Sequence, residues 1–201
     1  RVGLVGENGT GKTTLFRIIM NTESSDSGKI GFRKGAQAAT LEQELNAYNG
    51  SVLERVISGN PSLQVIRQKM DDLEKQMSSD PTSEATTSHY GKLQHKFEQL
   101  NGYELEPKAC SILSGLGFSD DKLKKPLNEF SGGWRMRVEM ARLLLQNPDI
   151  LLLDEPTNHF DLKSVEWLEG FLKNYDGSLL LISHDRRFLN NMVTRIVELD
   201  R

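Results

Sequence analysis

The sequence has very little cysteine and no long hydrophobic run. Cys110 is the only cysteine among 201 residues, so no internal disulfide can form and nothing points to an oxidising compartment. No apolar segment approaches the roughly 20 residues that a membrane-spanning helix needs. No signal peptide is visible. We therefore expect a cytoplasmic protein that does not insert into a membrane.

The chain also lacks an excess of charge of either sign. Lysine and arginine number 25, aspartate and glutamate number 28, and the formal net charge is −3. This balance argues against a protein that binds nucleic acid through a surface that is basic all over, so any such contact must use a local patch. The length is enough for one good-sized domain, or for a core with a small subdomain.

Apolar runs and helical patterns alternate along the chain. We expect strands at 2–5, 150–153, 179–182 and 193–199, short strands within 30–42, and helices at 15–20, 105–116, 134–146, 165–172 and 186–192. This alternation predicts an α/β fold with a mostly parallel central sheet. Because the first residues already read as a buried strand, we expect the sequence to be a piece of a longer protein that lacks the first strands of its domain.

Residues 61–107 have a different pattern. On both sides of a polar stretch at 78–88, apolar residues recur at helical spacing; they are Ile66, Met70, Leu73, Met77, Tyr90, Leu93, Phe97 and Leu100. Two amphipathic helices joined by a polar turn form an antiparallel hairpin. The hairpin either lies on the core as two ordinary surface helices, or projects from the core as an arm whose apolar stripes cover each other.

A glycine-rich loop separates the first strand from the first helix. Residues 6–13 fit the pattern G-x-x-x-x-G-K-[ST]. Glycines let successive backbone N–H groups point at phosphate oxygens, and the start of the helix adds partial positive charge. We expect Lys12 to reach the β- and γ-phosphates of a nucleotide and the Thr13 hydroxyl to bind Mg²⁺. The members of this candidate site are Gly6, Glu7, Asn8, Gly9, Thr10, Gly11, Lys12, Thr13 and Thr14.

Four further candidates follow strands, and ligands of open α/β sheets bind at the carboxyl ends of strands. Asp154 and Glu155 come directly after the run 150–153. We expect Asp154 to hold Mg²⁺ and Glu155 to act as general base toward the attacking water, the alternative being a solvated acidic turn. His184 follows the run 179–182 and is a candidate contact of the γ-phosphate. Gln43 ends a strand-like segment and is a candidate contact of Mg²⁺ or the water.

A second anion site is expected where Ser131, Gly132 and Gly133 precede the helix at 134–146. Free N–H groups at a helix start bind anions, and the arginines of this helix, at 135, 137 and 142, are expected to add positive charge nearby. One triphosphate does not need two glycine cradles. We therefore expect the second cradle to serve the nucleotide of a partner domain, with two nucleotides held between two similar domains.

The stretches GENGTGKTT, FSGGWRMR, ILLLDEPTNHFDL and LISHDRRFL together resemble the ATP-binding cassette (ABC) ATPases over nearly the whole chain. The sequences SGGW and DEPTNH, together with the hairpin, resemble the first cassette of the ABC-F subfamily. The resemblance implies a P-loop ABC nucleotide-binding domain with an ATPase core at 1–43 and 147–201. It also implies a helical subdomain at 44–146, with the arm at about 61–107 and the signature motif at 130–137.

The resemblance implies roles for single residues as well. Residues 6–14 would form the phosphate loop for ATP, and Gln43 would be the Q-loop glutamine. Ser131 to Gly133 would bind the γ-phosphate held by the partner cassette. Asp154 and Glu155 would be the metal-site carboxylate and the base, 158–161 the D-loop between domains, and His184 the switch histidine. ATP and Mg²⁺ are the implied cofactors.

Two functions from different classes fit these motifs. The first is an ABC-F ATPase whose second cassette lies in the same polypeptide or in a homodimer partner. It would regulate translation on the ribosome, with the arm meeting rRNA, tRNA or a ribosomal protein through its lysines, Lys69, Lys75, Lys92 and Lys96. The alternative is the ATP-binding subunit of an ABC membrane transporter, which needs a membrane partner. A chromosome-associated ATPase would need a far longer coiled coil than 61–107.

Overall fold

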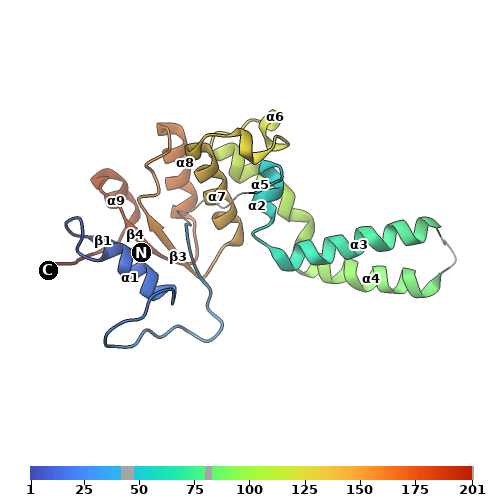
Figure 1. The fold of residues 1–201 in the computed structure, drawn as a ribbon, viewed down its shortest axis with the longest axis horizontal. Helices are drawn as coiled ribbons and strands as arrows, with labels where there is room; N and C mark the ends of the chain where they lie inside the picture. Colours follow the sequence, from blue (N-terminus) through green and yellow to red (C-terminus); the bar gives the residue numbers. More distant parts are fainter. Residues whose placement is uncertain (42–47, 80–82, 201) are drawn as a thin grey trace.

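The centre of the fold is a parallel sheet. The structure is a computed structural model that describes residues 1–41, 48–79 and 83–200. Within these residues the sheet has five strands, and every neighbouring pair runs parallel. In spatial order they are β2 (Ala38–Thr40), β3 (Ile150–Asp154), β4 (Ser178–Ile182), β1 (Val2–Val5) and β5 (Arg195–Glu198). The predicted α/β class with a parallel sheet is confirmed (Figure 1).

Helices cover the sheet and continue beyond it. In chain order the helices and 3₁₀ turns are α1 (Lys12–Ile19), α2 (Val52–Ile57), α3 (Pro61–Ser79), α4 (Glu84–Gln99), η1 (Gly102–Glu104), α5 (Leu105–Gly115), α6 (Asp120–Leu123), η2 (Leu127–Glu129), α7 (Gly132–Gln146), α8 (Leu162–Lys173) and α9 (Arg186–Met192). Over the part of the chain that is described, none of the helices is both long enough and apolar enough to cross a membrane.

Successive side chains of a strand point to opposite faces of the sheet. In the central strands both faces are buried, each by a different cluster. Leu151 and Leu153 of β3 belong to the larger core, which also takes in the buried faces of α7, α8 and α9. Leu152, between them, belongs to a second cluster with Phe16 of α1. Burial on both sides explains why the sequence of this strand is apolar throughout.

The strands expected within 30–42 form only at Ala38–Thr40 among the described residues. Ile30 and Phe32 are 47% and 45% exposed, and the chain turns shortly after them, where the N–H of Ala36 donates to the carbonyl of Arg33 at 3.0 Å. A strand is stabilised by pairing with a neighbour. No described strand lies beyond β2 at this edge of the sheet, so the prediction of short strands is wrong for the residues before Ala38.

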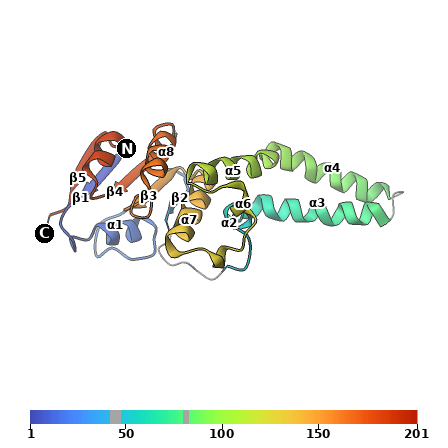
Figure 2. The same cartoon turned by 90° about the horizontal axis from the view of Figure 1, so that it is seen from above.

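Helices α3 and α4 pack side by side and project away from the sheet as an arm, as two perpendicular views agree (Figure 1 and Figure 2). Leu63, Ile66, Met70 and Phe97 are buried between them in a cluster that is separate from the two cores of the body. The hydroxyl of Tyr90 also donates across the arm to Glu74 at 2.7 Å. Of the two alternatives left open by the sequence, the structure shows the projecting hairpin.

Leu100, which the sequence pattern assigns to the apolar stripe of the arm, does not pack with the buried cluster of the arm. Leu100 is 46% exposed. Helix α4 ends at Gln99, and Leu100 takes a backbone conformation outside the helical region, with φ −91° and ψ 11°. Its side chain therefore leaves the register that Leu93 and Phe97 follow.

Replacing Met70 by alanine should loosen the arm and leave the body intact. Met70 is 1% exposed, and truncating a buried methionine costs about 2–5 kcal/mol. Because the arm has its own core, amide hydrogen exchange should accelerate in α3 and α4 while β3 and β4 stay protected. Met77→Ala is the matched control, since Met77 is only partly buried. Equal acceleration in the sheet would show that arm and body unfold as one unit.

Candidate functional site

The carboxyl ends of β1, β4 and β3 lie in one row of the sheet. Leu4 pairs with Ile182, and Ile182 pairs with Asp154. The phosphate loop, the acidic pair and the Ser183–Asp185 turn therefore leave the sheet side by side, at the carboxyl ends of the strands. The carboxyl ends of the strands are where open α/β sheets bind their ligands.

The phosphate loop needs glycine for its backbone. Gly6, Gly9 and Gly11 have positive φ values of 150°, 84° and 94°. A Cβ atom on Gly6 would lie 2.4 Å from the carbonyl oxygen of Leu199, so a side chain at this position collides with backbone. The loop can thus curl tightly between β1 and α1 only with glycine at these places.

The side chain of Lys12 folds back onto the phosphate loop and binds backbone carbonyls at its start. Its Nζ donates to the carbonyls of Gly6 and Glu7 at 2.8 and 2.7 Å, and the residue is buried. The ammonium group is therefore held within the curve of the loop, where phosphate-binding loops receive their anion. It is a strong, charge-assisted donor for phosphate oxygens.

Thr13 and Asp154 meet across the sheet edge. The Thr13 hydroxyl donates to Asp154 Oδ2 at 2.8 Å, although the residues are far apart in sequence. Among the described residues, no group of three or more histidine, cysteine, aspartate or glutamate side chains could hold a metal ion alone. Mg²⁺ usually takes one or two protein oxygens and completes its shell with water and phosphate. The hydroxyl–carboxylate pair fits such a site.

Glu155 lies beside this pair in an uncommon backbone conformation, with φ 47°. Its N–H donates to the carbonyl of Ile182 at 2.9 Å, which extends the pairing of β3 with β4 by one residue. Burial raises the pKa of Glu155, while the nearby His184 acts in the opposite direction. Glu155 Oε1 is buried, has no hydrogen-bond partner among the described residues, and lies 3.7 Å from His184 Nε2. A buried acceptor without a partner is suited to receive a water.

A cleft of about 670 Å³ leads from Thr13 and Asp154 to α7. Thr13 and Asp154 line one part of it, and Glu139 and Arg142 of α7 line another. The expected glutamine of the site, Gln43, lies outside the described residues.

Ser131, Gly132 and Gly133 stand at the start of α7, as the sequence predicts. Ser131 is the N-cap in an extended conformation, and its side chain makes no capping hydrogen bond. A Cβ atom on Gly132 would meet no atom of the described residues within 4 Å. No contact found among the described residues joins these three residues to the phosphate loop. The first turn of α7 is therefore open to an anion from outside this site.

Arg137 does not supply positive charge to that first turn, contrary to the sequence-based expectation. Its guanidinium is buried and donates to Asp161 Oδ2 at 2.9 Å, to the His159 carbonyl at 2.9 and 3.1 Å, and to Leu116 and Ser164. Arg142 is likewise engaged, since its Nε donates to Glu139 at 2.7 Å.

Arg137 therefore joins α7 to the predicted D-loop, a role that the sequence reasoning missed. Asp161 caps α8 by accepting the N–H of Ser164 at 3.0 Å. Trp134 stacks on the other side of the arginine, with the guanidinium carbon 4.7 Å from the indole centroid. Trp134 also packs edge-on against Phe118, so the indole is a packing residue of the body.

The family comparison agrees with this geometry. The family model described as ABC transporter matches residues 1–158. "Probable ATP-binding protein YheS" of Escherichia coli K12 is 41% identical over 201 residues, which is all of this chain and 30% of that protein. "ATP-binding protein Uup" of the same organism is 39% identical over 202 residues and is covered to 31%.

A solved structure of the archaeal ribosome recycling factor aABCE1 with the ribosomal stalk protein aP1 has a TM-score of 0.62 and 26% identity. The match covers 98% of this chain and 31% of that one. The chain belongs to the ABC ATPase family, as its motifs predicted. It spans about 30% of the length of the curated relatives that it matches.

Exchanging Asp161 for asparagine should alter the acid stability of the cassette. The Ser164 N–H and Arg137 hold the pKa of Asp161 at about 2, below the ordinary value near 4. The ionised carboxylate thus stabilises the folded chain at neutral pH, and this contribution is lost as the pH falls from about 4 to about 2. Asparagine retains the helix cap but not the charge.

Urea unfolding should accordingly give Asp161→Asn a lower free energy of unfolding than the parent at pH 7. The two values should converge toward pH 2. Asp161→Ala, which also loses the cap, should be about 1 kcal/mol less stable than Asp161→Asn throughout. Parallel pH curves for the parent and Asp161→Asn would contradict the assigned role of the charge.

Proposed function

We propose that this chain is the first cassette of a cytoplasmic ABC-F protein that binds and hydrolyses ATP with Mg²⁺ between two cassettes. The observation that carries the proposal is the contact of Thr13 with Asp154, beside Glu155 and His184, at one edge of the sheet. The ABC-F assignment is supported by the SGGW and DEPTNH motifs, by the arm and by the similarity to YheS and Uup.

Each residue of the site has a role in this proposal. The phosphate loop and Lys12 hold the β- and γ-phosphates, and Thr13 and Asp154 supply the protein oxygens of the Mg²⁺ site, with Gln43 as a further ligand. Glu155 accepts the proton of the attacking water, and its buried Oε1, which has no hydrogen-bond partner among the described residues, supports this role. His184 contacts the γ-phosphate from the end of β4.

The site is one half of a functional pair. Ser131, Gly132 and Gly133 bind the γ-phosphate of the nucleotide on a second cassette, in the same polypeptide or in a homodimer partner. Ser131 and Gly132 are exposed at the start of α7, away from the chain's own phosphate loop, which supports this arrangement. The isolated chain is therefore expected to hydrolyse ATP slowly.

The variant Glu155→Gln tests the proposed chemistry. The full-length protein should still bind ATP, because the phosphate loop is unchanged, but its steady-state hydrolysis should fall by at least about 100-fold, as expected for loss of general base catalysis. The protein should accumulate as a closed, ATP-bound form. Lys12→Ala is the contrasting variant: it should lose nucleotide affinity, at about 1.5–3 kcal/mol for each charge-assisted hydrogen bond removed. Normal turnover by Glu155→Gln would remove Glu155 from the role of base.

We also propose that the protein acts on the ribosome and that the arm binds there. Lys69 and Lys96 lie on one side of the arm and line a groove of about 610 Å³ together with Leu93. None of the described carboxylates forms an ion pair with these two lysines, whereas Lys75 is paired with Asp72 at 3.7 Å. The description of aABCE1 as a ribosome recycling factor supports a ribosomal role.

The double variant Lys69→Ala/Lys96→Ala tests this binding surface. If the lysines meet RNA phosphates, the variant should co-sediment less with ribosomes. The dependence of log affinity on log salt concentration should become shallower by about one unit for each lysine–phosphate interaction that the substitutions remove. Lys108→Ala, an exposed lysine of α5 in the body, is the control. Unchanged sedimentation and an unchanged salt slope would show that this side of the arm does not bind RNA.

A further inference from the structure

A buried carboxylate in the middle of α7 joins this helix to α2. Glu139 is 4% exposed. Its Oε1 accepts a hydrogen bond from Arg55 Nε at 2.6 Å, and its Oε2 accepts one from Arg142 Nε at 2.7 Å. Arg142 belongs to the same helix as Glu139, but Arg55 comes from α2. The pair formed by Arg55 and Glu139 is therefore a short, charge-assisted link between two helices.

Helix α2 leads directly into the arm. It is a short helix held at its start by a reciprocal capping box between Ser51 and Glu54. Two residues after α2 ends, Gly59 passes so close to α7 that a Cβ atom there would lie 2.9 Å from Arg142 Cγ and 3.1 Å from its carbonyl oxygen. Helix α3 begins at Pro61. The chain thus touches the Glu139–Arg142 segment of α7 immediately before it enters the arm.

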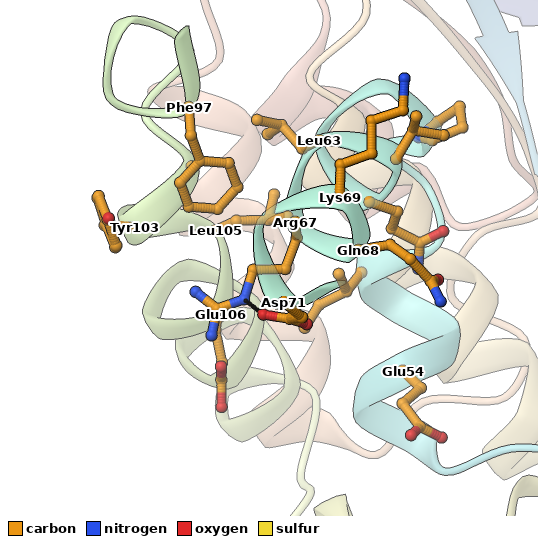
Figure 3. Close-up of a pocket in the computed structure, with 15 residues that line it drawn as sticks. Glu54, Leu63, Arg67, Gln68, Lys69, Asp71, Phe97, Tyr103, Leu105 and Glu106 are labelled. Atoms are coloured by element: carbon orange, nitrogen blue, oxygen red, sulfur yellow. Dashed lines mark ion pairs between the residues drawn. The ribbon is translucent and has the colours of Figure 1, made fainter. Parts of the chain in front are cut away.

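The arm has little other support from the body. Among the described elements, α3 packs extensively only on α4, and α4 otherwise meets η1. A cavity of about 780 Å³ opens at the base of the arm, with Glu54 of α2 on one side and Phe97 and Tyr103 on the other (Figure 3). The direction of the arm is therefore set by α2 and by the connection from α4 through η1 to α5.

The other end of α7 belongs to the nucleotide-dependent part of the cassette. The helix starts at Gly132, in the turn that is proposed to meet the partner's nucleotide. It holds the D-loop through Arg137, and its Glu139 and Arg142 line the cleft that reaches Thr13 and Asp154. A continuous helix of 15 residues connects these contacts to Glu139 without an interruption that could absorb a shift.

We propose that Arg55 is a positioning residue which, through Glu139, transmits the position of α7 to the arm. Nucleotide binding that displaces α7 carries Glu139 with it, and α2 follows because separation would break the short, charge-assisted hydrogen bond from the largely buried Arg55 to Glu139. The arm then changes direction at its base. The coupling is reciprocal, so a load on the arm alters nucleotide affinity in turn. The inference rests on the proposed function only in that the site must bind nucleotide.

The test measures the direction of the arm. In the full-length protein with its native cysteines replaced, spin labels at Gln76→Cys on the arm and Glu166→Cys on α8 report the distance between arm and body. Distances are compared with ADP and with a non-hydrolysable ATP analogue. We expect the distance distribution to shift between the two nucleotides in the parent. Arg55→Met should abolish the shift although it still binds the analogue, and Arg55→Lys should restore part of it.

Arg67→Met is the matched control, because the ion pair of Arg67, with Asp71 at 3.1 Å, lies within α3 and does not involve α2 or α7. It should keep the full shift. Arg55→Met retains the pair of Arg142 with Glu139, so the buried carboxylate keeps a partner and the fold should survive; thermal unfolding checks this. A full shift in folded Arg55→Met, or no shift in the parent, overturns the inference. Failure of the ribosome proposal would leave this result unaffected, since ribosomes are absent from the assay.

Discussion

The site depends on the parallel pairing of β1, β4 and β3 in one register. Leu4, Ile182 and Asp154 lie in a row across these strands, so the loops that follow them start at the same height. Thr13 can then reach Asp154 at 2.8 Å, and His184 comes within 3.7 Å of Glu155. A slip of one residue would turn every side chain of a strand to the opposite face. The burial of Leu151, Leu152 and Leu153 on alternating sides therefore fixes the chemistry as well as the core.

Helix α7 organises the rest of the cassette through charges that point inward. Arg137 is compensated by Asp161 and by backbone carbonyls, and Glu139 is compensated by two arginines. Buried charges of this kind add little net stability, but removing one partner is costly because the other is left alone. Their effect is to fix geometry. One charge ties the helix to the D-loop and the other ties it to α2, on opposite sides of the same rigid element.

The sequence was most informative where a motif acts through its own backbone. The phosphate loop requires glycine at Gly6 and a lysine after Gly11, and both requirements are visible as spacing. It was less informative where partners are distant: Arg137 and Asp161 are 24 positions apart, so Arg137 appeared to serve the anion site at the start of α7. The apolar pattern around Ile30 and Phe32 was misleading because a strand also needs a neighbour. The pattern of the arm predicted its helices, but only packing could decide that they project.

Three buried side-chain atoms have no hydrogen-bond partner within the part of the chain that the structure describes. Among the described residues they are Asn60 Nδ2, Arg135 Nε and Glu155 Oε1. A folded chain ordinarily satisfies such groups, so each exception needs a physical reason. Glu155 faces the proposed reaction site, Arg135 belongs to the first turns of the helix that follows Ser131, and Asn60 lies at the joint between α2 and the arm. These three atoms thus lie at the places where the proposals require a ligand, a second cassette and a change in the direction of the arm.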